Sequence, residues 1–315
     1  MKDSKVVIIG SYNVGLSMKG SRFPEIGETF TADQFFEGPG GKGSNQVIAA
    51  SVFGANTSFV GCIGNDKYGK DALAAYLNYG ISTQYVKIEP SIHTGIAFIL
   101  IDQQGRNMIE IASGANLKLT SGDIDRAEQE IKNAAVVGFQ LEGDIELVDY
   151  GIRKVHSMGI PTLLDPAPAI PLKEDLYPLI DYIKPNETEA KILTGIHVED
   201  QGSAEKAGKW FVDKGVGTAI ITLGEMGTMV VSNDYSEYFP VRKVTAVDTT
   251  GAGDIFCGAF MTALADEKKI PEAIEFANHA AALSVTRFGV VESIPSIKEV
   301  KEFILKGVNK KNKKN

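Results

Sequence analysis

The chain has 315 residues, of which 43% are hydrophobic and 23% charged, a composition typical of a globular protein with a substantial core. Its net charge of -8 argues against a nucleic-acid partner, because binding phosphates along a backbone needs a basic face. No stretch approaches the roughly 20 apolar residues of a membrane span, so no membrane partner is expected. The N-terminus leads directly into a strand-like segment, and we expect a cytoplasmic protein. Cys62 and Cys257 lack metal-ligand spacing and are expected to be buried free thiols.

Short β-branched segments alternate along the chain with longer segments of helical periodicity. Strands are predicted at residues 6–9, 58–63, 135–141, 161–164, 182–184 and 219–223. Helices whose apolar residues recur at spacings of three and four are predicted at residues 71–79, 123–133, 146–158, 204–214 and 271–286. This alternation predicts an α/β protein with a largely parallel sheet that helices cover on both faces.

Two regions break this alternation, residues 11–40 and residues 92–112. In the second region two apolar segments flank the turn at residues 102–106, which predicts a hairpin. Because these strands interrupt the helices, we expect them to form a small second sheet that serves as a lid or a dimerisation surface. The expected organisation is a single domain over residues 1–305 with these lid strands inserted. A disordered basic tail is expected at residues 306–315.

The strongest local motif is Asp-Thr-Thr-Gly-Ala-Gly-Asp at residues 248–254, followed at once by an apolar helical segment. Small residues at a helix start expose backbone N–H groups, which together with the helix dipole attract an anion such as a transferring phosphoryl group. Asp254 could then orient a hydroxyl nucleophile and accept its proton. Beside a helix N-terminus this carboxylate should stay ionised and be a weak base. From this motif alone, a glycine turn with a capping aspartate is an alternative.

A second glycine-rich segment, residues 38–46, leads into another predicted helix. Gly38, Gly40 and Gly43 fit the spacing of a dinucleotide site, but that motif should close the first strand of the main sheet, and here it does not. We instead expect these glycines to allow close approach to a ligand, while Lys42 and Asn45 supply donors that suit a polyol.

Residues 64–71 nearly match a P-loop. Asp71 stands where Ser or Thr should bind magnesium, and Asp66 would repel phosphate, so we interpret this match as coincidence.

Three weaker motifs follow predicted strands. Asn186 and Glu189 suit hydrated magnesium, Thr222 and Gly224 end a strand where ligands bind in open α/β sheets, and Glu142 could bind hydroxyls. Taken singly, each is more often a helix cap or an ordinary turn.

Assembled, these motifs resemble the ribokinase branch of the ribokinase-like (PfkB) carbohydrate kinases over residues 6 to about 303. The resemblance rests on residues 10–13, 40–45, 140–142, 165–168, 185–189, 222–224, 248–254 and 281–289. It implies a Rossmann-like three-layer α/β/α domain with a β-sheet lid, magnesium-ATP as phosphoryl donor, and a small sugar, ribose by default, as acceptor.

The resemblance also implies the ligand sets, position by position. The sugar would be held by Asn13, Gly41, Lys42, Asn45, Glu142 and Asp254. The anion hole would be Gly251, Ala252 and Gly253, with Asp254 as catalytic base. The nucleotide would contact Asn186, Thr222, Gly224, Gly227, Gly253 and Asn278, and Asn186 and Glu189 would order Mg²⁺ through water.

Two further properties come only from the resemblance. Members of this family are activated by potassium, and the matching positions are Asp248, Thr250, Ser284, Arg287, Gly289 and Ser293. They often pair through their lids, so a homodimer is expected.

One residue departs from the family pattern. The family carries Asp two residues after Asn13, where it accepts hydrogen bonds from two sugar hydroxyls, and this chain has Gly15. Losing a charge-assisted acceptor weakens the grip on a diol. A ketose, a deoxy sugar or a nucleoside is therefore an alternative substrate. A non-catalytic nucleotide- or sugar-binding regulator is an alternative function, as is a nicotinamide dehydrogenase built on residues 38–43.

Overall fold

The main sheet has nine strands in the order β13-β12-β11-β10-β9-β8-β1-β4-β5. The computed structural model describes the backbone of residues 5–311 and the side chains of residues 5–306. The strands from β11 to β5 are parallel, while β12 and β13 add an antiparallel edge. The strands are β1 Lys5–Ile9, β4 Asn56–Gly64, β5 Ser82–Glu89, β8 Val136–Gln140, β9 Thr162–Asp165, β10 Tyr182–Ile183, β11 Thr218–Thr222, β12 Gly227–Ser232 and β13 Ser236–Pro240.

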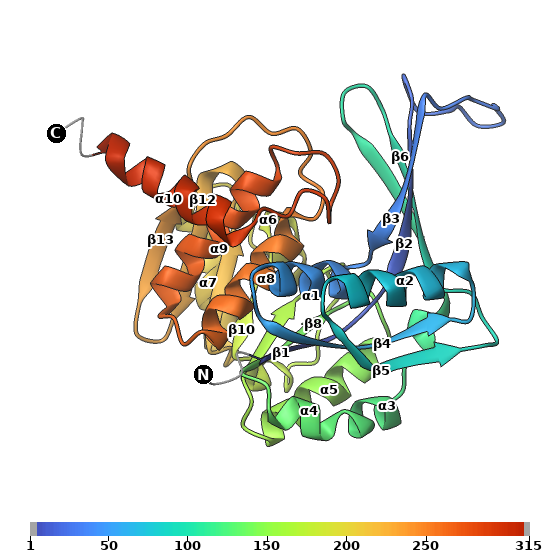
Figure 1. Ribbon diagram of the computed structural model, residues 1–315. Helices are drawn as coiled ribbons and strands as arrows, with labels where there is room; N and C mark the ends of the chain where they lie inside the picture. The colour runs from blue at the N-terminus through green and yellow to red at the C-terminus, as the bar shows by residue number, and fades with distance from the viewer. Residues whose placement is uncertain (1–4, 312–315) are drawn as a thin grey trace.

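Helices cover both faces of this sheet, because its central strands are apolar on both sides. In β1, Val6 and Ile8 belong to one core and Val7 and Ile9 to the other. The first core contains α1 Lys42–Val52, α2 Lys67–Asn78, α8 Ala252–Ala265, α9 Ile270–Ser284 and α10 Ile297–Lys311. The second contains α3 Ser121–Arg126, α4 Glu128–Lys132, α5 Ile145–Ser157, α6 Glu187–Thr194 and α7 Gln201–Asp213. The predicted three-layer α/β/α fold is thus confirmed (Figure 1).

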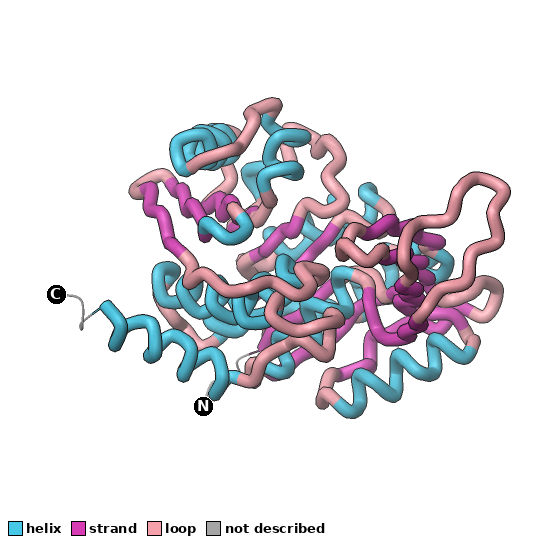
Figure 2. Tube along the Cα trace, turned by 90° about the horizontal axis from the view of Figure 1, so that it is seen from above, coloured by secondary structure: helices cyan, strands magenta, loops and turns pink. Residues whose placement is uncertain are grey.

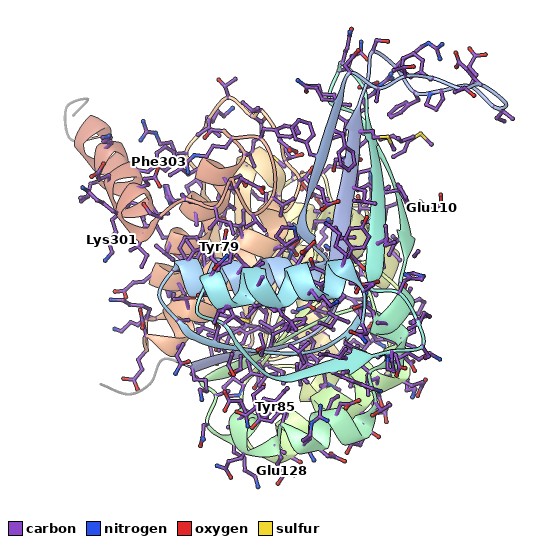
Figure 3. All side chains as sticks on the ribbon, turned by 45° about the vertical axis from the view of Figure 1, so that its right-hand side comes forward. Tyr79, Tyr85, Glu110, Glu128, Lys301 and Phe303 are labelled. Carbon is purple, nitrogen blue, oxygen red and sulfur yellow. The ribbon has the colours of Figure 1, made fainter. Side chains whose placement is uncertain are left out.

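A separate four-stranded sheet stands on one end of this body (Figure 1). Its order is β3-β2-β6-β7, formed by β2 Asn13–Lys19, β3 Gln34–Gly40, β6 Gly95–Ile101 and β7 Asn107–Ala112. The pair β6 and β7 is the predicted hairpin. Figure 3 shows the side chains of this sheet projecting beyond the body, with Glu110 of β7 on its outer side. We refer to these four strands as the lid sheet.

Several elements differ from the sequence-based expectation. The strands β5, β12 and β13 were not predicted, and the helix expected at residues 123–133 is divided at Ala127 into α3 and α4. The tail expected to be disordered from residue 306 begins as helix, since α10 packs Val300 into the core and continues to Lys311 without a proline to end it. Residues 312–315 of that predicted tail lie outside the described residues.

The C-terminal helix α10 lies at the end of the molecule opposite the lid sheet (Figures 1 and 2). None of the helices within residues 5–311 is long and apolar enough to cross a bilayer. Cys62 and Cys257 are buried free thiols, as predicted.

The helices α1 and α8 touch where Gly258 faces α1. A Cβ atom at Gly258 would lie 2.6 Å from Cβ of Ala49 and 2.8 Å from the backbone N of Ala50, distances that real Cβ atoms do not adopt. Because the two helices pack this closely, their N-termini lie near the same edge of the main sheet. This is the edge at which the parallel strands end.

We expect Gly258→Ala to lower the free energy of unfolding by about 1–3 kcal/mol, because the extra methyl group forces α8 away from α1. The matched control is Gly122→Ala in α3, where a new Cβ would meet only Oγ1 of Thr120 at 3.8 Å. That change should be neutral or stabilising by up to about 1 kcal/mol. Urea unfolding of both variants checks this, and equal stabilities would contradict the close contact.

Candidate active site

A cavity of about 560 Å³ opens at the carboxyl ends of the parallel strands, between the N-termini of α1 and α8. In open α/β sheets this edge is the usual place for a ligand. The six residues predicted to contact a nucleotide all line this cavity: Asn186, Thr222, Gly224, Gly227, Gly253 and Asn278. Lys42, Glu189 and Asp254 also face it, so distant motifs of the sequence meet in one place.

The predicted anion hole is the start of α8. Gly251 is the N-cap, with φ of 75° and no side chain to cap the first amides, and it lines the cavity together with Ala252 and Gly253. A Cβ atom at Gly251 would lie 2.3 Å from Cγ1 of Val290, so both the conformation and the space require glycine. No side chain caps the N–H groups of this first turn, and such groups at a helix start are a place where an anion can bind.

Asp254 lies in the first turn of α8 and is only 4% exposed. Its Oδ2 accepts a hydrogen bond from Nδ2 of Asn45 at 2.8 Å, and its Oδ1 accepts one from Nε2 of Gln46 at 3.2 Å. The Lys42 ammonium lies 3.9 Å from Oδ1. Burial raises the pKa of Asp254 above its usual value, although Lys42 lowers it. The expectation that the helix N-terminus would keep this carboxylate a weak base was therefore wrong, because α1 covers it and excludes water.

A second buried carboxylate, Asp165 at the end of β9, completes a network of charges beside Asp254. Its Oδ1 lies 2.8 Å from Nζ of Lys184, and its Oδ2 accepts a hydrogen bond from Nε2 of Gln46 at 3.0 Å. Lys42 lies 3.9 Å from the same Oδ2, and Oε1 of Gln46 accepts from Gln140 at 2.7 Å. Sequence reasoning gave none of Asp165, Lys184, Gln46 or Gln140 a role. The available signal was that Asp165 directly follows one predicted buried strand and Lys184 is the last residue of another, both at the ligand-binding edge.

The predicted sugar-binding residues surround the other side of Asp254, under the lid sheet. Glu142 follows β8, and its Oε2 accepts hydrogen bonds from Oγ of Ser11 at 2.5 Å and from the backbone N of Lys42 at 2.9 Å. Burial raises the pKa of Glu142, while the hydrogen bonds from Ser11 and Lys42 lower it. Glu142 therefore lies beside the start of α1. It does not cap α5, the helix that follows it in the sequence.

Asn13, on β2, accepts a hydrogen bond on Oδ1 from Nδ2 of Asn116 at 2.9 Å. Asn116 also bonds both backbone groups of Tyr12, so it fixes the entry to the lid sheet, and sequence reasoning missed it. Gly41 has φ of 84°, and a Cβ there would lie 2.6 Å from the backbone N of Asn13. A glycine is needed at position 41 because two backbone segments pack closely there. It would also allow a ligand to approach the backbone closely.

The cavity is lined by both polar and apolar residues. Asn186 and Glu189 form a capping box at the start of α6, with Glu189 accepting from N and Nδ2 of Asn186 at 2.9 and 3.0 Å. Asn278 accepts from Oγ1 of Thr228 at 2.6 Å and is held at the cavity wall. The apolar part of the lining, which sequence reasoning missed, consists of Val241, Val244, Ala246, Phe256, Ala281, Ala282 and Val285.

The positions matched to a potassium site come from two segments that the structure joins. Asp248 accepts hydrogen bonds from the backbone N of Thr250 at 3.0 Å and of Gly289 at 3.1 Å. The hydroxyls of Ser284 and Ser293 bond nearby carbonyl groups, and Arg287 pairs with Glu299. This loop adjoins the anion hole through the contact of Val290 with Gly251.

Two motifs that were discounted have structural explanations. Gly38 and Gly40 lie in β3 of the lid sheet, so the dinucleotide spacing does not follow a strand of the main sheet. Asp66 is the N-cap of α2 and accepts from the backbone N of Gly69 at 2.8 Å, so the near match to a P-loop is a helix cap.

Comparisons with known proteins agree with this geometry. The sequence matches the pfkB family of carbohydrate kinases over residues 3–297. It is 40% identical over 299 residues to a ribokinase of Haemophilus influenzae, covering 95% of this chain and 98% of the relative. A deoxyribokinase of Salmonella typhi is 36% identical over 300 residues, with coverages of 95% and 98%. A solved ribokinase of Arabidopsis thaliana, complexed with ribose and ATP, has a TM-score of 0.86 at 31% identity and coverages of 95% and 97%.

The chain therefore belongs to the pfkB family of carbohydrate kinases. The resemblance stated from its motifs is confirmed, and so are the ribokinase-like fold and the class of enzyme, a phosphotransferase with an alcohol group as acceptor.

Proposed function

We propose that the protein is an ATP-dependent kinase that phosphorylates a hydroxyl of a small ribose-like pentose. The observation that carries this proposal is the position of Asp254. It closes the glycine turn at the start of α8, lies between the nucleotide cavity and the sugar-side residues, and is buried with a raised pKa. The H. influenzae ribokinase and the A. thaliana ribokinase bound to ribose and ATP support the choice of substrates.

The proposed reaction is a direct transfer. The sugar hydroxyl oxygen attacks the γ-phosphorus of ATP, the bond from that phosphorus to the bridging oxygen breaks, and ADP leaves with the electron pair. Asp254 orients the hydroxyl and accepts its proton, while the N–H groups of residues 251–253 bind the transferring phosphoryl group. Asn13, Gly41, Lys42, Asn45 and Glu142 would hold the sugar, and closure of the lid sheet would exclude water.

Magnesium fits the cavity as a hydrated ion. Both carboxylate oxygens of Glu189 already accept hydrogen bonds from Asn186, which leaves lone pairs for water and favours contact through water over direct coordination. Within residues 5–306 no three His, Cys, Asp or Glu side chains gather as a metal-binding group. When bound, Mg²⁺ would neutralise charge on the ATP phosphates, and Asn186 and Glu189 would order its water shell.

Potassium activation is part of the proposal, at Asp248, Thr250, Ser284, Arg287, Gly289 and Ser293. What supports it is that Asp248 ties the loop containing Gly289 to the anion hole, so a cation held there would fix the position of the first turn of α8. Assays with potassium replaced by tetramethylammonium should show a lower kcat. An unchanged rate would remove this part of the proposal.

A homodimer formed through the lid sheet is also proposed. Phe35, Phe98 and Met108 are 60%, 46% and 57% exposed, and the strand register places them on the face of the sheet opposite to Asn13. An exposed apolar face of this kind is typical of an association surface. Light scattering should give twice the mass of one chain, and a monomer at working concentration would contradict the proposal.

A cytoplasmic location is proposed because the donor is ATP and because Cys62 and Cys257 are unpaired.

Asp254→Asn should lower kcat by about 10²–10⁴-fold, because the amide cannot accept the hydroxyl proton. The measurement is the release of ADP. The unaltered enzyme is first assayed with pentoses, ketohexoses, deoxy sugars and nucleosides to find its substrate. The variant should bind ATP and unfold like the parent. Asp175→Asn, which removes a carboxylate 71% exposed and outside the cavity, should keep full activity. Full turnover by Asp254→Asn would sink the mechanism, and binding of NAD in place of ATP would favour a dehydrogenase.

The pH dependence follows from the raised pKa of Asp254. Because the carboxyl must be ionised to accept a proton, kcat/KM should fall as the pH is lowered through this pKa, with a midpoint above the value of about 3.9 for an ordinary Asp. The hydrogen bond from Asn45 lowers the pKa of Asp254. Asn45→Ala removes this bond and should therefore move the midpoint of the pH profile to higher pH. A rate that is constant down to about pH 4 would contradict the expected shift.

Gly15 is the residue that bears on the choice of sugar. A Cβ at this position would meet only the carbonyl O of Gly38, at 3.6 Å, so the backbone accepts a side chain here. We expect Gly15→Asp to fold normally and to lower the KM for ribose by about tenfold or more, because it adds a charged acceptor for a diol. Gly15→Asn is the uncharged control. An unchanged KM would indicate that another group already takes these hydroxyls, such as Glu292, whose Oε1 lies 3.6 Å from the Cβ position of Gly38.

A further inference from the structure

Lys184 is a buried cation at the active site that the proposed mechanism does not yet use. It directly follows β10, its backbone N donates to the carbonyl O of Leu164 at 2.9 Å, and its side chain is only 4% exposed. Burying an ammonium group is costly unless it is paired, and Asp165 provides that pair at 2.8 Å.

The Lys184 ammonium lies directly against the anion hole. Its Nζ is 3.0 Å from the point that a Cβ atom of Gly253 would occupy, so the ammonium lies in tight contact with the backbone of the first turn of α8. Lys184 also lines the nucleotide cavity, together with the first turn of α8. The side chain is therefore sealed from bulk solvent and yet faces the space in which phosphates would lie.

The charge of Lys184 is maintained in this position. Burial would lower the pKa of its ammonium group, but Asp165 and Glu189 outweigh burial and raise the pKa. An ammonium group has three N–H donors, and among the side chains that the structure describes Asp165 is the one ion-pair partner of Lys184, at 2.8 Å. Donors thus remain for a further anion.

We propose that Lys184 is a catalytic residue that binds a non-bridging oxygen of the γ-phosphoryl group of ATP from the side of the main sheet. This inference rests on the proposed function. As the hydroxyl oxygen bonds to the γ-phosphorus, the bond to the bridging oxygen breaks, ADP leaves with the electron pair, and the hydroxyl proton passes to Asp254. Lys184 balances the negative charge on the phosphoryl oxygens throughout and gives up no proton.

The charged side chains next to Lys184 explain why its contact with the phosphoryl group would stabilise the transfer step more than it stabilises bound ATP. When Asp254 accepts the proton it loses its negative charge. Of the two aspartates that form ion pairs with Lys42 and Lys184, only Asp165 then remains charged. The surplus positive charge is matched by the phosphoryl group that has just become attached to the sugar. A cation held in a water-poor site acts strongly on such charge.

Lys184 could instead serve only as the counter-charge of Asp165, which is a purely structural role. Comparing the affinities of a Lys184 variant for ATP and for ADP distinguishes this role from the proposed one. If Lys184 contacts the γ-phosphoryl group, Lys184→Met should weaken ATP binding about tenfold or more and ADP binding far less. It should also lower kcat by about 10²–10³-fold, with little change in the KM of the sugar. Calorimetry on the full chain with each nucleotide, and ADP-release kinetics, give these values.

The double variant Asp165→Asn/Lys184→Met guards against a folding failure, because it leaves no unpaired buried charge. It should show the same selective loss of ATP affinity. The matched control is Lys154→Met, which removes a lysine paired with Asp125 and Glu128 outside the cavity and should leave both affinities unchanged.

Equal weakening of ATP and ADP in both Lys184 variants, or an unchanged kcat, would overturn this proposal. The affinity comparison does not need turnover, so it remains readable if no sugar is phosphorylated by the unaltered enzyme, a result that would instead contradict the proposed function. If the unaltered enzyme turns over and the Lys184 variants keep its preference for ATP over ADP, only the proposed role of Lys184 is contradicted, and the proposed function stands.

Discussion

The structure depends on the pairing of four charged side chains, three buried and one, Lys42, partly exposed, where the carboxyl ends of the central strands meet the N-termini of α1 and α8. Asp165 and Asp254 are almost without solvent contact, and Lys184 and Lys42 neutralise them at 2.8 to 3.9 Å. Charges in a water-poor interior are tolerated only when they are paired and hydrogen-bonded. The sheet order, the close contact of α1 with α8 at Gly258, and the glycine turn at Gly251 together satisfy this condition.

The same constraint produces the chemical properties of the site. Covering Asp254 with α1 removes water from its carboxylate and raises its pKa, which makes it a better proton acceptor than an aspartate at an exposed helix start. No side chain of the turn caps the amides of residues 251–253, and the amide of Ala252 donates to the carbonyl O of Thr249 at 3.3 Å. The lid sheet is attached through Tyr12 and Asn116, and Asn116 also holds the side chain of Asn13.

The sequence predicted those parts of the protein that depend on local pattern. The parallel strands, the hairpin of β6 and β7, the turn at residues 248–254 and residues that line the cavity could be identified because strand ends and glycine turns have short-range signatures. The pairing of Asp165 with Lys184 could not, since it depends on β9 and β10 being neighbours in the sheet. The pKa of Asp254 was predicted in the wrong direction, because burial by α1 is a tertiary property. The strands β5 and β13 are the edge strands of the main sheet, where half-exposed sequences carry a weaker signal, whereas β12 is a buried antiparallel strand beside β13.

The central claim is that this network holds Asp254 against the sugar hydroxyl that receives the phosphoryl group. A crystal structure of the Asp254→Asn variant with ATP, magnesium and a pentose tests it most directly. The account predicts one sugar hydroxyl within about 2.6–3.2 Å of the side chain at position 254 and in line with the γ-phosphorus. It also predicts the phosphoryl oxygens on the amides of residues 251–253. A bound sugar whose hydroxyls all approach Glu142 and lie out of line with the γ-phosphorus would contradict the account.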